Sequence, residues 1–358
     1  MSIVIEYYPG NAAKHELTEF FKKENFQRCN YFLKPFPKGS TYLNWFESKD
    51  YKSLDGLEVV VYPDKENSPK GWSVFTRTRV WASAYDKQKQ NEVIKKLRKQ
   101  YGGQFYNDSQ GKNRYIKIDD TDFLTPSESG VFQVYERVKS QLHKLGTAIN
   151  DHHEVDYLEK NKSAHKDIVN MIKESLPSLA LYNSLIPFLV SAIEHFFREL
   201  FAVLVEFDSY GKEEVRKVKL KDTREFNTIE DIFNVKNDVT KIERELAKGF
   251  NFQNLDRINE IYKRFLKIDI KEILSIKKKV LSRHYFLLTQ LSELIDRRHW
   301  IIHHFGFSSD IDRKKYLYFL NLTGCIIDTI IEYLEKDKKM KVIEHSIYYG
   351  IAIGERKN

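Results

Sequence analysis

Arginine and histidine side chains are concentrated in one short stretch of this 358-residue chain. Within the segment Leu291 to Phe307, two arginines and three histidines occupy the eight residues from Arg297 to His304. The leucines and isoleucines around them follow helical spacing, which predicts a helix facing a core. Placing that much charge on a core-facing helix costs free energy unless the charges have partners or a function.

Arginine and histidine together could cleave RNA without a metal ion. The reaction needs a base for the 2′-hydroxyl proton, an acid for the 5′-oxygen leaving group, and fixed positive charge beside the phosphate. Histidine titrates near neutral pH and suits both proton transfers, whereas arginine stays charged and forks onto phosphate oxygens. The products would be a 2′,3′-cyclic phosphate and a 5′-hydroxyl. In a structural alternative, the arginines lie at the surface and the histidines cap the helix.

Two arginine–histidine pairs are possible in this helix. Arg298 and His303 are five residues apart, which places them about 140° apart around an ideal helix and off a common face. Arg297 and His304 are seven residues apart and share one face. A single helix would therefore hold the first pair poorly, and the spacing alone leaves both pairs open.

The order of residues at this position is similar to that of a known family. The residues are Arg298-His299-Trp300-Ile301-Ile302-His303, followed by His304-Phe305-Gly306. They resemble the motif of the HEPN superfamily of ribonucleases: arginine, a polar residue, three mostly apolar residues, histidine and then a small turn residue. His299 takes the polar position, where asparagine is commoner in the family. The resemblance favours the first pair, because Gly306 follows His303 at the family spacing.

The resemblance extends over about residues 128–336. The segment from Ser191 to Phe201 resembles the family's helix beside the motif, and the segment from Asn251 to Phe265 resembles its middle helix. The first of these segments supplies Glu194 and Arg198, which would orient or neutralise the site. They are equally compatible with a simple ion pair between residues four apart on a helix.

The resemblance implies a metal-independent endoribonuclease that needs no cofactor, with Arg298, His299 and His303 as catalytic residues. It further implies a homodimer in which two facing copies pool their motifs into one site. Such domains in prokaryotes commonly act in toxin–antitoxin and anti-phage defence systems, so an antitoxin or regulatory protein would be a further partner. The alternative hypothesis is a catalytically silent HEPN-like module that binds RNA or protein.

The surrounding elements predict an α+β multidomain protein: a small α/β domain over residues 1–125, followed by an all-α HEPN-like helical bundle over residues 126–358. The polar segment from Asp119 to Gly130 is the expected linker. In the first domain the apolar pattern predicts strands at residues 3–5, 57–62, 73–81 and 114–118, and helices at 15–24 and 87–101. In the second it predicts helices at residues 132–145, 165–175, 185–207, 238–248, 256–265, 273–304 and 317–336. Pro187 would then lie in the first turn of its helix.

One face of the strand expected at 73–81 mixes aromatic and cationic side chains, namely Phe75, Arg77, Arg79 and Trp81. Such a face can hold single-stranded RNA through stacking and phosphate contacts. Further cations follow it in the sequence and complete the candidate RNA-binding set: Lys95, Lys96, Arg98, Lys112 and Arg114.

Composition narrows the function classes. The formal net charge of +8 suits a protein that binds a polyanion such as RNA. Cys29 and Cys325 are far apart and fit no metal site, and His152-His153-Glu154 lacks a third ligand at a recognisable spacing. The phosphate-binding loop, the serine-hydrolase elbow and the zinc-protease helix motif are absent from the sequence. No membrane span or secretory signal is expected, so the expected location is cytoplasmic.

Overall fold

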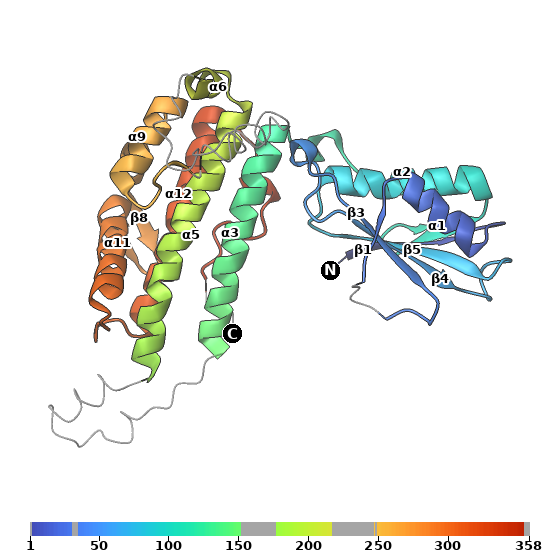
Figure 1. The fold of residues 1–358 in the computed structure, drawn as a ribbon, viewed down its shortest axis with the longest axis horizontal. Helices are drawn as coiled ribbons and strands as arrows, with labels where there is room; N and C mark the ends of the chain where they lie inside the picture. Colours follow the sequence, from blue (N-terminus) through green and yellow to red (C-terminus); the bar gives the residue numbers. More distant parts are fainter. Residues whose placement is uncertain (1, 31–34, 152–176, 217–246, 248, 354–358) are drawn as a thin grey trace, which may run out of the picture. The chain divides into compact units, whose positions relative to one another are not determined.

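The computed structural model describes residues 2–30, 35–151, 177–216, 247 and 249–353 (Figure 1). The chain divides into two compact units, residues 1–129 and 130–358. This division falls in the first turn of helix α3 (Pro126–Asp151). The helix expected at residues 165–175, most of the one expected at 238–248, and the His152-His153-Glu154 cluster lie outside the described residues.

The first unit is an antiparallel sheet with helices α1 and α2 packed on one face (Figure 1). The strand order is β2-β3-β4-β5-β1-β6-β7, and all neighbouring strands pair antiparallel. In chain order the elements are β1 (Ser2–Tyr8), α1 (Lys14–Lys23), β2 (Gln27–Arg28), β3 (Thr41–Trp45), β4 (Leu57–Pro63), β5 (Trp72–Arg79), α2 (Ala84–Tyr101), β6 (Gln104–Asn107) and β7 (Gly111–Lys112). Two 3-10 turns lie at Lys49–Tyr51 and Asp120–Asp122.

Alternation along the strands places the core of this unit between the sheet and the helices. Ile5 of β1, Val59 of β4 and Val74 of β5 are fully buried, and they belong to one cluster with Phe21 of α1 and Ile94 of α2. Residues two apart on a strand share a face, so these strands each present one apolar side to the helices. The mixed α+β class predicted for the chain is therefore found in this unit.

The strand expected at residues 114–118 does not form. The chain pairs only at Gly111–Lys112, and Asn113 then adopts a left-handed backbone with φ 56°. Asn91 of α2 holds the next segment instead, since its side chain accepts from the Ile116 N–H and donates to the Ile116 carbonyl, each at 2.9 Å. A side chain thus replaces the neighbouring strand as the partner of this backbone.

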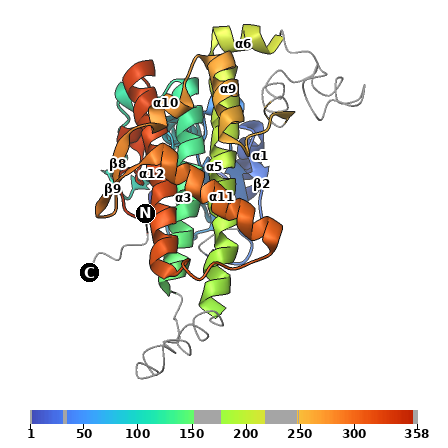
Figure 2. The same ribbon diagram turned by 90° about the vertical axis from the view of Figure 1, so that its left-hand side faces the viewer.

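The second unit is a bundle of helices that also contains a β-hairpin (Figure 2). After α3, the elements are α5 (Pro177–Phe207), α6 (Ser209–Arg216), α9 (Leu255–Leu266), α10 (Ile270–Leu274), β8 (Lys277–Val280), β9 (Arg283–Phe286), α11 (Leu287–His304), α12 (Arg313–Lys338) and a 3-10 turn at Ile343–His345. Helix α5 contacts α6, α9, α11 and α12, so its apolar side chains form much of the core.

The hairpin corrects the prediction of an all-α second domain and of one helix over residues 273–304. As a strand, residues 277–280 alternate between two faces, so that Lys278 pairs with Glu332 of α12. Leu281 turns the chain with φ 55°, Val280 is buried, and the Tyr285 ring packs 5.0 Å from the Tyr318 ring. Tertiary packing therefore outweighs the helical preference of the flanking residues.

Helix α5 begins at Pro177, earlier than the expected start at residue 185. Pro187 consequently lies inside the helix, and the prediction that it occupies the first turn is wrong. Its ring nitrogen cannot donate the hydrogen bond that the Asn183 carbonyl would accept in a regular helix.

Among the described residues, α12 alone has the length and hydropathy of a membrane span, and 72% of its apolar window is buried inside the unit. Its Tyr316, Phe319 and Leu322 are buried core residues. A helix buried to this extent is a core helix of the bundle.

Candidate active site

Helix α11 carries the arginine and histidine residues and packs against α5 and α12 (Figure 2). Its buried residues Leu291, Leu294 and Ile301 face the bundle. This face fixes the rotation of the helix about its axis, and therefore the directions in which the polar side chains leave it.

Arg298 lies near enough to Glu194 of α5 for its charge to act on that carboxyl. The Nε atom of Arg298 and the Oε1 atom of Glu194 are both buried, and neither has a hydrogen-bond partner among the described residues. Burial raises the pKa of the Glu194 carboxyl, while the positive charges of Arg298 and Arg198 partly offset that effect. Arg298 thus has a neighbouring counter-charge but no hydrogen bond that commits its Nε donor.

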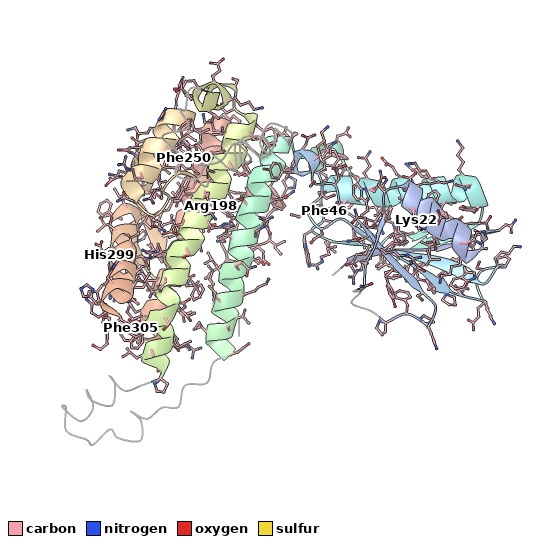
Figure 3. The ribbon with its side chains drawn as sticks, in the orientation of Figure 1. Lys22, Phe46, Arg198, Phe250, His299 and Phe305 are labelled. Carbon is pink, nitrogen blue, oxygen red and sulfur yellow. The ribbon has the colours of Figure 1, made fainter. Side chains whose placement is uncertain are left out.

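His299 and His303 lie one turn apart on the exposed side of α11, where Figure 3 labels His299. Their ring centroids are 4.1 Å apart, with an angle of 45° between the ring planes. Two imidazoles in contact can exchange protons with a bound group near neutral pH.

Arg297 is held by two carboxylates. Its Nε donates to Glu293 at 3.0 Å, and its two terminal nitrogens donate to Asp310 at 2.9 and 2.7 Å. Its guanidinium also lies 5.6 Å from the centroid of the Phe319 ring. Arg297 therefore fastens the segment after α11 to the helix, and its donors are occupied.

His304 is directed back along its own helix. Its Nδ1 lies 3.1 Å from the Trp300 carbonyl oxygen, and its ring stacks on the Trp300 ring with centroids 5.7 Å apart. Arg297 is thus held by carboxylates, and His304 is held by Trp300. Of the two pairs that the spacing leaves open, Arg297 and His304 are therefore each engaged by other groups, and no hydrogen bond joins Arg298 to His303 among the described residues.

The end of α11 explains the glycine that follows the motif. Phe305 ends the helix in a left-handed conformation with φ 48° and ψ 38°, and it is 92% exposed. A Cβ atom on Gly306 would lie 2.6 Å from the Trp300 ring. A side chain at this position would therefore displace the indole that stacks on His304.

On α5, the contacts differ from a simple Glu194–Arg198 ion pair. Arg198, labelled in Figure 3, places Nη2 3.2 Å from Nδ1 of His195, and its Nε lies 3.7 Å from Glu199. Burial lowers the pKa of His195. His195 carries no signal in the sequence except its spacing of three residues from Arg198.

The residues proposed to bind RNA in the first unit are not gathered on one open face. Phe75 is buried and packs 5.1 Å from the Phe36 ring, and the Arg77 guanidinium is paired with Glu58. Strand β5 ends at Arg79, so Trp81 lies in the following turn, with its ring 5.5 Å from the Arg79 guanidinium. The expectation that Trp81 shares a strand face with Phe75, Arg77 and Arg79 is therefore wrong, because the alternation of side chains stops where β5 ends.

The remaining cations of that set lie on α2 and after it. Lys95 lies 5.2 Å from the Tyr115 ring, Lys96 pairs with Glu24 at 2.7 Å, and Arg98 donates to the Tyr115 hydroxyl at 3.3 Å. Lys112 and Arg114 are exposed.

Comparison of the chain with models of known protein families, with curated proteins and with solved structures finds no match.

Proposed function

We propose that the protein is a metal-independent endoribonuclease whose site is formed at Arg298, His299 and His303. The observations that carry the proposal are the buried Nε of Arg298, which has no hydrogen-bond partner among the described residues, and the contact between the exposed His299 and His303 rings on the same helix. Arg298 keeps one donor that no described residue occupies, whereas the neighbouring Arg297 is occupied by carboxylates.

In the proposed reaction, one imidazole removes the proton from a ribose 2′-hydroxyl, and the 2′-oxygen attacks the adjacent phosphorus. The bond from phosphorus to the 5′-oxygen breaks, and a second imidazolium donates its proton to that oxygen. Arg298 stabilises the additional negative charge on the phosphate oxygens. His303 and its counterpart in a second copy make the two transfers, and His299 holds the His303 ring in position.

The second copy would cover an apolar surface at the end of α11. The side chains of Trp300, Ile302, Phe305 and Phe307 are all substantially exposed there. Clustered exposed apolar side chains of this size are typical of an interaction surface. A symmetric dimer through this surface would bring the two His303 residues towards a shared cleft.

The test is cleavage of total RNA by the purified protein in excess EDTA. We expect fragments with 2′,3′-cyclic phosphate and 5′-hydroxyl ends, and a loss of at least about 100-fold in rate for Arg298→Ala and for His303→Ala. His15→Ala removes an exposed histidine of α1 and should leave the rate unchanged. Fragments that end in a 3′-hydroxyl would contradict the mechanism. RNA binding without cleavage would instead support the catalytically silent module.

A further inference from the structure

The β8–β9 hairpin separates its side chains onto two different faces. In the antiparallel register, Lys277 is opposite Phe286, and Lys279 is opposite His284. Directly opposed residues, and residues two apart on a strand, share a face. These four residues therefore form one face, which we call the hairpin face, and all four are exposed.

The opposite face attaches the hairpin to the bundle. Lys278 forms an ion pair with Glu332 of α12, and the Tyr285 ring packs on Tyr318 of the same helix. Val280 is 3% exposed, and at the open end of the hairpin the Leu287 N–H donates to the Ile276 carbonyl at 3.1 Å. Because these contacts attach the opposite face to α12, the hairpin face points away from the bundle.

The hairpin face is cationic and contains no carboxylate. Between Glu272 and Glu293 the chain carries three lysines and one arginine and no acidic residue. The Phe286 side chain is 51% exposed, and its ring lies 4.7 Å from Lys277 Nζ. Cations beside an exposed ring are the two components that bind single-stranded nucleic acid through phosphate contact and base stacking.

We propose that the hairpin face binds single-stranded RNA, with Lys277 and Lys279 contacting successive phosphates and Phe286 stacking on a base. The two lysines are two residues apart on an extended strand, hence about 7 Å apart. This regular spacing along a narrow ribbon suits an extended polyanion better than a lipid surface, which would require a broad apolar area. The inference rests on the proposed function and adds to it a contact for the substrate outside the reactive site.

The position of the hairpin suits such a contact. Phe286 directly precedes α11, and Arg298 lies twelve residues further along, which corresponds to about 18 Å along the helix axis. A strand that contacts both places would need only a few nucleotides between them. Substrate affinity would therefore come partly from the hairpin face, whereas reactivity would come from α11.

The binding test uses a fluorescent, uncleavable 2′-O-methyl single-stranded RNA and the full chain with His303→Ala, followed by anisotropy at several salt concentrations in EDTA. Lys277→Gln with Lys279→Gln should weaken binding about tenfold. It should also reduce the slope of log affinity against log salt by about 1.4, or about 0.7 for each phosphate contact. Phe286→Leu should weaken binding about tenfold and leave the slope unchanged.

The matched control is Lys336→Gln with Lys338→Gln, which removes the same charge from the exposed last turn of α12. It should retain the affinity and slope of the parent protein. Equal losses in the control and hairpin variants would overturn the proposal, because the effect would then be one of net charge. Loss of binding to phosphatidylserine vesicles in the hairpin variant, with RNA binding intact, would overturn it in favour of a membrane contact.

The same lysine substitutions in a chain with intact α11 separate this proposal from the proposed nuclease. Cleavage that is independent of the lysines at subsaturating RNA would overturn the hairpin proposal and leave the nuclease in place. Lysine-dependent RNA binding by a chain that never cleaves would keep the hairpin proposal and reject the nuclease. Thermal unfolding of each variant verifies that the fold is retained.

Discussion

Arg297 and Arg298 are adjacent in the chain and have the same chemistry, yet the fold uses them differently. Arg297 is occupied by Glu293 and Asp310, whereas Arg298 has a buried Nε without a hydrogen bond among the described residues. The sequence could not separate them, because the choice depends on the rotation of α11 and on the Asp310 carboxylate after the helix. The residue pattern therefore indicated the candidate residues but could not tell which arginine is engaged by carboxylates.

Substitution of Asp310 tests the structural role of Arg297. Hydrogen bonds from Arg297 hold the pKa of Asp310 below its ordinary value of 3.8. A lowered folded-state pKa contributes stability above the unfolded pKa, and that stability is lost as pH falls through the folded pKa. Because Asp310 is half-exposed, we expect Asp310→Asn to lower the free energy of unfolding by about 0.5–1 kcal/mol at pH 7.

Urea unfolding at pH 7 and near pH 3 measures this difference, which should shrink at the lower pH. Asp337→Asn, at an exposed position of α12, is the control and should change little at either pH. A deficit for Asp310→Asn that persists unchanged in acid would show that the ion pair is not its source.

At the scale of elements, prediction succeeded where the residue pattern alone determines the structure. The α1 and α2 helices and strands β1, β4 and β5 were expected near their observed positions, since alternation and helical spacing specify them locally. Strands β3 (Thr41–Trp45) and β6 (Gln104–Asn107) were not expected. Both are short: β3 pairs with β4, the next strand in the chain, and β6 pairs with β1, which is distant in sequence. The β8–β9 hairpin was missed because packing on α12, and not the residue pattern, fixes it.

The segment after α12 supplies a further test at this scale. The Asn321 side chain donates to the Ile353 carbonyl and accepts from the Ile353 N–H, each at 2.8 Å. Asn321→Ala removes both bonds and should lower the free energy of unfolding by about 1–3 kcal/mol. It should also make residues 343–353 more sensitive to limited proteolysis, which mass spectrometry of the fragments would detect.

Thr323→Val is the matched control for Asn321→Ala. Its hydroxyl is also buried on α12, but it donates to the Phe319 carbonyl of the same helix. Equal proteolysis of the two variants would refute a specific attachment of the segment by Asn321.

At the scale of the whole molecule, the chain combines a helix-covered antiparallel sheet with a helical bundle, each with its own core. The candidate reactive residues and the hairpin face both belong to the bundle. The sequence indicated the two-part organisation through the change from alternating to helical patterning. It could not place the aromatic and cationic residues of the first unit, because burial of Phe75 and pairing of Arg77 depend on neighbouring strands and loops.

A shared active site predicts that activity and dimerisation are lost together. Phe305→Asp places a charge in the exposed apolar surface, at a left-handed position that aspartate tolerates. We expect a monomer in sedimentation velocity and a loss of at least about 100-fold in RNA cleavage. Phe46→Asp, at a half-exposed position of the first unit, should affect neither property. A wild-type chain that cleaves RNA as a monomer would exclude the shared site.

Pro187 makes α5 easier to bend at one turn, because it removes a backbone hydrogen bond there. A helix that lacks one backbone hydrogen bond bends most easily at that turn. The unsupported carbonyl belongs to Asn183, whose side chain bonds to the Ser308 N–H at 2.8 Å and to the Ser308 carbonyl at 3.0 Å. Bending of α5 at Pro187 would therefore move the segment after α11, which contains Ser308. The C-terminal end of α11 would then shift relative to Glu194.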